Sequence, residues 1–173
     1  MSEPLWAPWR MEYILSKKEG GCIFCTYAEA DEVVFAREHV LVATDEAFVL
    51  LNKYPFAAGH LLVVPRRHVG ELELLSDVEH DALFRLTRDA ATRLRRAVSC
   101  QGLNVGLNLG KSAGASLGEH LHVHIVPRWD GDTNFMPVLA DVRVMPQHLQ
   151  ATFQHLYPFF LDIPGRRAGR PAP

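Results

Sequence analysis

The sequence predicts an α+β fold, in which an antiparallel β-sheet packs with one long helix and a C-terminal helix. Short apolar runs separated by turn residues fill the first half of the chain, which is the pattern of an antiparallel meander. A long stripe of apolar residues at helical spacing follows, and strand patterns return after it. With 173 residues, 48% of them apolar, the chain is long enough to bury one sizeable core.

The chain divides into an arm, one domain and a tail. Residues 1–20 carry aromatic side chains without a regular period, so we expect an N-terminal arm that packs by its rings. Residues 21–163 form the predicted domain, and residues 164–173, rich in Gly, Pro and Arg, are expected to be a flexible basic tail.

The charge balance and the apolar runs exclude several classes of partner. Eighteen basic and 20 acidic residues give a formal charge of −2, which argues against binding to nucleic acid. The sequence has no run of apolar residues long enough for a membrane span and no pattern of a signal peptide. We therefore expect a cytoplasmic protein without a membrane partner.

The elements are expected in the following order. Four strands are predicted at residues 33–36, 39–44, 47–52 and 60–65, with charged or turn-forming residues between them. A long helix should begin at Ser76, because the residues from Ser76 to Glu79 form a capping box, and Gly102 is its expected end. A strand at 103–109, a loop at 110–118 and a helix at 146–157 complete the prediction.

The segment after that loop carries a row of histidines. Three of them alternate with three apolar residues, in the order His120, Leu121, His122, Val123, His124 and Ile125. In a strand this period of two places the histidines on one face and the apolar residues on the other. Successive imidazoles then stand about 6–7 Å apart, so the row can flank a phosphate. A neutral imidazole can attack phosphorus and form a covalent intermediate.

The loop at residues 110–118 lies next to the histidine row in the sequence. It supplies three glycines, two serines and Lys111, which together favour an anion-binding loop, although glycine and serine also fill ordinary connections between strands.

Cys22 and Cys25 have the spacing of half a tetrahedral zinc site, which would take its other two ligands from the nine histidines. The spacing does not select those histidines. A second interpretation uses the histidine row itself as a catalytic metal site that activates a water. A third, a thioredoxin-like redox pair, is disfavoured because no helical pattern opens at Cys22.

The segment from His120 to Val126 matches the His-φ-His-φ-His-φ-φ signature of the histidine triad family of nucleotidyl hydrolases and transferases. The chain resembles that family over residues 22–137. The segments at residues 5–10 and 127–135 are similar to the bacterial diadenosine tetraphosphate phosphorylase branch.

The resemblance implies roles for individual residues. The catalytic residues would be His122 as the nucleophile on the α-phosphate, His124 as a ligand of phosphate oxygens, and His60 as a supporting histidine. The substrate-binding residues would be Asn52 at the ribose, with His124, Asn108 and Ser116 along the phosphate path.

The resemblance also implies one structural zinc ion per chain and no organic cofactor. The four ligands would be Cys22, Cys25, His68 and His120. Four protein ligands leave no open position for a catalytic water, so this metal would support the fold.

The expected activity is cleavage of dinucleoside polyphosphates through a nucleotidyl-histidine intermediate, with phosphorolysis of diadenosine tetraphosphate to ADP and ATP as the leading expectation. Ser116 stands where other branches carry a glutamine, which leaves phosphate and water open as acceptors. The alternatives are a hydrolase of the same substrates, a nucleoside phosphoramidase, a metallohydrolase and a non-catalytic nucleotide-binding protein. Members of this family typically form homodimers that join two sheets, so a homodimer is expected.

Overall fold

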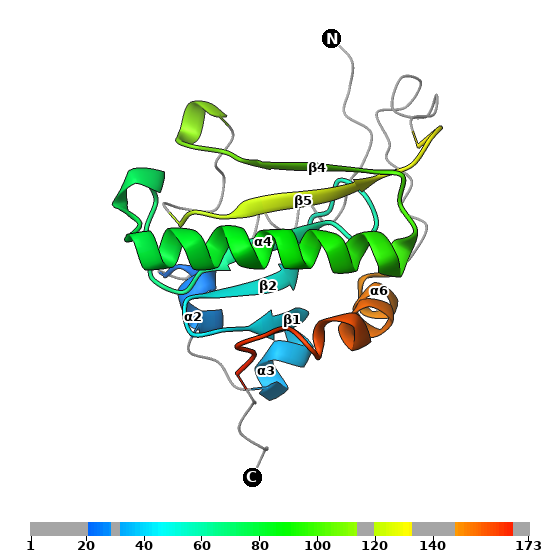
Figure 1. Ribbon diagram of the computed structural model, residues 1–173, viewed down its shortest axis with the longest axis horizontal. Helices are drawn as coiled ribbons and strands as arrows, with labels where there is room; N and C mark the ends of the chain where they lie inside the picture. Colours follow the sequence, from blue (N-terminus) through cyan, green and yellow to red (C-terminus); the bar gives the residue numbers. More distant parts are fainter. Residues whose placement is uncertain (1–20, 29–31, 114–119, 133–147, 168–173) are drawn as a thin grey trace.

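The computed structural model describes residues 21–28, 32–113, 120–132 and 148–167 (Figure 1). The predicted N-terminal arm and residues 168–173 of the predicted tail lie outside these ranges. Five strands form one antiparallel sheet in the order β1-β2-β3-β5-β4. Their bounds are β1 Val40–Ala43, β2 Ala47–Leu51, β3 Leu61–Pro65, β4 Gly102–Leu107 and β5 Val123–Arg128. The predicted α+β fold is confirmed.

The first three strands form the predicted meander, and the chain then crosses the sheet by one long helix, α4 (Asp77–Val98). After α4 the chain enters the edge strand β4 and returns as β5 between β4 and β3. In this register His124 of β5 pairs with Leu62 of β3 and with Gly106 of β4. The third histidine of the row therefore lies in the interior of the sheet.

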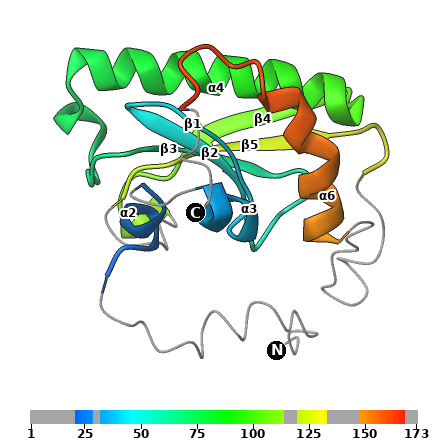
Figure 2. The same cartoon turned by 90° about the horizontal axis from the view of Figure 1, so that it is seen from below.

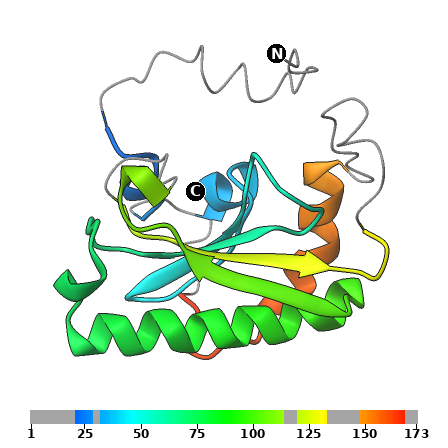
Figure 3. The same cartoon turned by 90° about the horizontal axis from the view of Figure 1, so that it is seen from above.

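Helices cover both faces of the sheet, with α4 on one side and the short helices α2 (Ile23–Ala28) and α3 (Glu32–Arg37) on the other (Figures 2 and 3). Each face of the sheet has its own hydrophobic core, and successive side chains of β3 point alternately into one core and the other. Leu61 and Val63 pack in the cluster on the α4 side, whereas Leu62 and Val64 pack in the cluster that contains Phe24 of α2. Because both faces are covered, every residue of β3 is buried.

The capping box of α4 forms as the sequence predicts. Ser76 Oγ accepts the N–H of Glu79 at 3.3 Å, and Glu79 Oε2 accepts the N–H of Ser76 at 2.9 Å. The expected end at Gly102 is wrong, because the helix ends at Val98 and Ser99 takes the left-handed conformation at the C-cap (φ 48°). Gly102 is the first residue of β4, where strand pairing with Arg128 has already begun.

Two further predictions need correction. The strand expected at residues 33–36 is part of the helix α3, since a run of four apolar residues has too few positions to distinguish the two periods. The second concerns Cys22, after which the sequence predicted no helix, an expectation that disfavoured a redox pair. Helix α2 begins directly after Cys22, so that expectation is also wrong.

The C-terminal helix α6 spans Leu149–Leu156 and continues into the 3-10 turn η3 (Tyr157–Phe160). Of the predicted tail, residues 164–167 are described. The Arg167 N–H donates to the carbonyl of Ala43 in β1 at 2.8 Å, and its guanidinium pairs with Asp45 at 3.0 Å. Among the described helices, none is both long and apolar enough to cross a membrane.

Candidate active site and metal site

The histidine row lies where β5 begins. His120 and His122 lie just before the strand, in residues without regular secondary structure, and His124 lies within it. The strand therefore starts three residues later than the row does. The predicted alternation is present, because Leu121, Val123 and Ile125 pack in the core beneath α4. The ring of Phe24 in α2 lies 5.4 Å from each of the rings of His120 and His122, on the opposite face of the sheet.

Burial keeps the imidazoles of this site neutral. His60, His120 and His122 expose 0%, 2% and 5% of their surface. Desolvation, followed by the neighbouring histidines His124 and His122, lowers the pKa of His60 to about 3. Desolvation, followed by the charge of His122, lowers the pKa of His124 to about 4. Desolvation also lowers the pKa of His122 below its ordinary value, and a hydrogen bond to the backbone carbonyl of His120 opposes this shift.

One hydrogen bond fixes the tautomer of His122. Its Nδ1 lies 2.9 Å from the carbonyl oxygen of His120, and a carbonyl only accepts, so Nδ1 carries the proton and donates it. The neutral ring therefore keeps its lone pair on Nε2. The arrangement gives His122 the protonation state of a nucleophile.

A chain of hydrogen bonds fixes the tautomers of His60 and His124. The backbone N–H of Phe56 donates to His60 Nδ1 at 3.1 Å, so the proton of the neutral ring is on Nε2. That Nε2–H donates to His124 Nδ1 at 2.9 Å, which places the proton of His124 on its own Nε2. Within the described residues, His124 Nε2 is buried and has no hydrogen-bond partner. A buried donor without a partner is costly, so this N–H is available to an oxygen of a ligand.

The remaining predicted substrate residues lie at different points of the fold. Asn52 follows β2 and adjoins the chain of hydrogen bonds, with its Nδ2 at 3.3 Å from His60 Nδ1 and its Oδ1 accepting the N–H of Tyr54 at 2.9 Å. Asn108 is half-buried and directly follows β4, whose last residue, Leu107, pairs with Val123 next to His122. Ser116 lies outside the described residues.

Sequence reasoning missed Phe56, which helps to cover the site. Its ring stacks on His60 with the centroids 5.0 Å apart and the planes inclined by 24°, while the phenyl remains 51% exposed. An aromatic residue in a turn segment near a predicted site histidine was the signal available in the sequence.

The four predicted zinc ligands come together on the side of the sheet that α2 covers. Cys22, Cys25, His68 and His120 offer ligand atoms that lie within 4.8 Å of one another. Cys22 Sγ is 3.2 Å from His120 Nδ1, and Cys25 Sγ is 3.3 Å from His68 Nδ1. Cys22 directly precedes α2 and its carbonyl accepts the N–H of Thr26, so the first turn of the helix brings the sulfur atoms of Cys22 and Cys25 to one side.

The tautomer of His120 fits a metal. Its Nε2 lies 2.8 Å from the carbonyl oxygen of Pro65, so Nε2 carries the proton and the lone pair of Nδ1 faces the sulfur atoms. Desolvation lowers the pKa of His120 to about 4, with the hydrogen bond to Pro65 opposing and His68 and His122 adding to the shift. Two thiolates and two neutral imidazoles are a ligand set typical of structural zinc.

The comparison with protein families decides the relationship. The HIT domain family matches residues 35–131, which is more than half of the chain and includes the whole histidine row. The chain belongs to the HIT domain family. The predicted resemblance to histidine triad proteins is therefore confirmed.

The chain is also similar to individual proteins in sequence and in fold. The chain is 42% identical over 154 residues to a Mycobacterium tuberculosis protein named AP-4-A phosphorylase, covering 86% of this chain and 79% of that protein. It is 33% identical over 93 residues to the asymmetrical bis(5'-nucleosyl)-tetraphosphatase of Schizosaccharomyces pombe, covering 54% of this chain and 50% of that protein. The crystal structure of a Zn-bound histidine triad family protein from Mycobacterium smegmatis has the same fold, with a TM-score of 0.64 and 23% identity over 81% of this chain and 93% of that one.

Proposed function

We propose that this HIT protein is an enzyme that cleaves dinucleoside polyphosphates, and that it converts diadenosine tetraphosphate and phosphate to ADP and ATP. The observation that carries the proposal is the pair of fixed tautomers, a free lone pair on His122 Nε2 and an unpartnered donor on His124 Nε2. The similarity to the M. tuberculosis protein named AP-4-A phosphorylase supports the substrate.

In the first step His122 Nε2 attacks the α-phosphorus of one adenosine moiety. The bond from nitrogen to phosphorus forms while the bond from phosphorus to the bridging oxygen breaks, and ATP leaves. The imidazole gains a positive charge, which its Nδ1–H shares with the carbonyl of His120 at 2.9 Å. His124 Nε2–H donates to a phosphate oxygen on which negative charge develops.

In the second step an oxygen of inorganic phosphate attacks the same phosphorus. The bond to His122 breaks, ADP leaves and the neutral imidazole is restored. Water in place of phosphate would give AMP, which is the hydrolase alternative. The similarity to the tetraphosphatase of S. pombe favours that alternative as the second candidate.

The histidines beside the nucleophile act through hydrogen bonds. His60 holds His124 in the tautomer that donates from Nε2, and the N–H of Phe56 holds His60 in turn. Asn52, half-buried beside His60, is the proposed ribose contact. Asn108 and Ser116 are the proposed contacts along the phosphate path.

The proposed zinc ion would be bound by Cys22, Cys25, His68 and His120 and would hold α2 against the histidine segment. In the described part of the chain, this is the only group of three or more Cys, His, Asp or Glu side chains spaced to hold a metal, and neither His122 nor His124 belongs to it. The geometry therefore does not favour the metallohydrolase alternative.

We also propose that the protein is a cytoplasmic homodimer in which the β4 strands of two copies join their sheets. Strand β4 is at the edge of the sheet, and Val105 at its centre is 52% exposed. Edge strands in native proteins are usually protected from pairing with other chains, so an apolar residue exposed at this edge favours an interface between two copies. Light scattering should give the mass of a dimer, and Val105→Glu should give a monomer. A parent protein of monomeric mass would contradict the dimer.

Product analysis tests the proposed activity. Incubation with diadenosine tetraphosphate should yield ADP and ATP only when phosphate is present. AMP and ATP in both incubations would replace the phosphorylase with a hydrolase, and the absence of any product would favour the non-catalytic binding protein.

A further inference from the structure

The segment from Pro65, the last residue of β3, to Val69 contributes two parts of the zinc site. The Pro65 carbonyl accepts the Nε2–H of His120 at 2.8 Å, and His68 supplies a ligand nitrogen. The carbonyl of Val69 also accepts the N–H of Leu121 at 2.6 Å. Both ends of the segment are therefore attached to the residues around the first histidine of the row.

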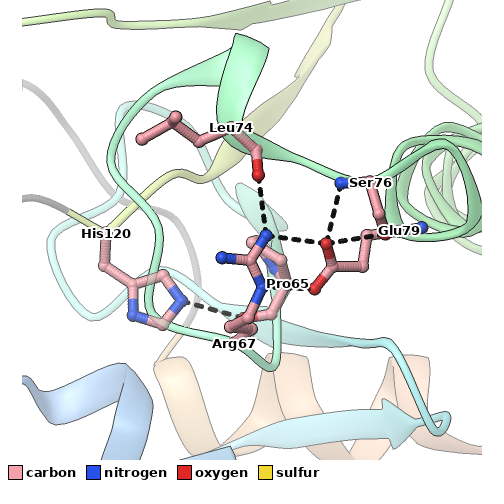
Figure 4. Close-up of polar contacts among 6 residues, drawn as sticks. All are labelled: Pro65, Arg67, Leu74, Ser76, Glu79 and His120. Carbon is pink, nitrogen blue, oxygen red and sulfur yellow. Dashed lines mark hydrogen bonds and ion pairs between the residues drawn. The ribbon is translucent and has the colours of Figure 1, made fainter.

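Arg67, in the middle of this segment, extends toward the start of α4 and the 3-10 turn η1 (Leu72–Leu74), as Figure 4 shows. Its Nε and Nη2 donate to the two carboxylate oxygens of Glu79 at 2.6 and 2.8 Å, and Nη2 also donates to the carbonyl of Leu74 at 2.8 Å. A two-pronged contact of this kind fixes the direction of the guanidinium as well as its distance.

The carboxylate of Glu79 is itself held in place. Its Oε2 accepts from the backbone N–H and the hydroxyl of Ser76, both at 2.9 Å, and its side chain is only 18% exposed. The hydrogen bond from Arg67, and next that from the Ser76 backbone, lowers the pKa of Glu79 to about 2. The pair therefore stays charged over the pH range in which the cysteines and histidines bind metal.

We propose that Arg67 and Glu79 are positioning residues of the zinc site. They attach the segment between Pro65 and Val69 to the N-terminus of α4, so that His68 and the Pro65 carbonyl are in place before the metal binds. Partners outside the ligand set raise metal affinity by orienting the ligands. The inference rests on the zinc site proposed above, and it predicts that this pair increases the affinity for zinc.

Helix capping alone would give a different result. Ser76→Ala removes the hydroxyl that caps α4 and its hydrogen bond to Glu79 Oε2. It leaves the hydrogen bonds that the Ser76 backbone N–H and Arg67 donate to the same carboxylate. Glu79→Gln keeps a capping-box residue and removes the charge that holds Arg67. Arg88→Gln is a matched control, because Arg88 forms an exposed ion pair with Asp89 on the same helix, without a contact to the zinc segment.

The test is competition for zinc between the protein and a chromophoric chelator, after the zinc content of the parent has been measured. Arg67→Gln and Glu79→Gln should each bind zinc about tenfold more weakly, at the lower end of the effect of such partners. The double variant should lose no more than either single one. Ser76→Ala should lower the melting temperature and weaken zinc binding much less than Arg67→Gln or Glu79→Gln does, because Arg67 still binds Glu79. Arg88→Gln should change neither the melting temperature nor the zinc affinity.

Co²⁺ provides a readout that does not depend on affinity, since its visible spectrum reports the geometry of the four ligands. The bands should shift in Arg67→Gln and Glu79→Gln and match the parent in Ser76→Ala. If Arg67→Gln does not fold, Glu79→Gln decides. If the parent binds zinc but the variants keep its affinity and its Co²⁺ spectrum, the role of Arg67 and Glu79 is contradicted and the zinc site stands. An equal loss of affinity in Ser76→Ala would contradict that role in the same way. A parent that binds no zinc would contradict the zinc site as well.

Discussion

The three histidines of the row have different partners, although they are equivalent in the sequence. His120 turns Nδ1 toward Cys22, His122 donates from Nδ1 to a carbonyl, and His124 accepts at Nδ1 from His60. His120 and His124 therefore carry their proton on Nε2, whereas His122 carries its proton on Nδ1. The row therefore combines one proposed metal ligand, one proposed nucleophile and one proposed donor.

His124→Ala tests the proposed donor. Removing a hydrogen bond that strengthens in the transition state should lower kcat about 10²- to 10³-fold with a smaller change in KM. Steady-state kinetics with diadenosine tetraphosphate measures this effect. Zinc content and circular dichroism serve as controls for folding, and a kcat within fivefold of the parent would contradict the role.

The sequence indicated the histidines of this site but not their tautomers. Alternation over residues 120–125 predicted which side chains share a face, because a period of two is a local property of the backbone. The partners of the rings come from residues far along the chain, such as Pro65 and His60. The stacking of Phe56 on His60 likewise depends on a turn whose conformation the sequence does not specify.

For helices and strands, the sequence predicted an element correctly where the side chains that stabilise it lie within the same segment. The capping box predicted the start of α4 because Ser76 and Glu79 bond across a single turn. The run at residues 33–36 was misassigned because its helix, α3, is stabilised by packing against a distant part of the chain. Phe35 packs against the cluster that includes Leu62 and Val64 of β3.

Cys22→Ser tests the link between α2 and the histidine segment. Loss of one thiolate should abolish stoichiometric zinc binding, and the free energy of unfolding should fall because bound metal stabilises the folded state. Elemental analysis should give one zinc per chain in the parent, and urea unfolding measures the change in stability. Cys100→Ser is a control, since Cys100 lies outside the metal group. Parent protein without zinc, or equal stability of the two variants, would contradict the structural role.

At the scale of the whole molecule, the position of β5 brings the two sites together. The strand enters between β3 and β4, so residues from the first and second halves of the chain meet at the histidine row. The order of the strands in the sheet depends on tertiary packing, and the alternation of residues along each strand does not reveal it. The pattern of residues predicted only the α+β class, whereas the resemblance to a known family predicted the particular fold.

Burial of neutral histidines should make the protein sensitive to acid. The pKa values of His60 and His124 are about 3 and about 4 in the folded protein, against 6.5 ordinarily. The unfolded chain therefore binds more protons below pH 6.5, and the free energy of unfolding should fall from there down to about pH 3. Thermal melts at pH 7 and pH 5 should show a smaller difference in His60→Asn than in the parent. Equal differences would contradict the burial of a neutral His60.

The most direct test of the central claim is to detect the covalent intermediate on His122. Rapid quenching with alkali during turnover of diadenosine tetraphosphate, followed by peptide mass spectrometry, should find AMP attached to the peptide that contains His122. His122→Ala should lack the adduct and lose at least about 10³-fold in kcat while keeping its fold and zinc. Turnover by His122→Ala close to that of the parent, or AMP attached to another residue, would contradict the account.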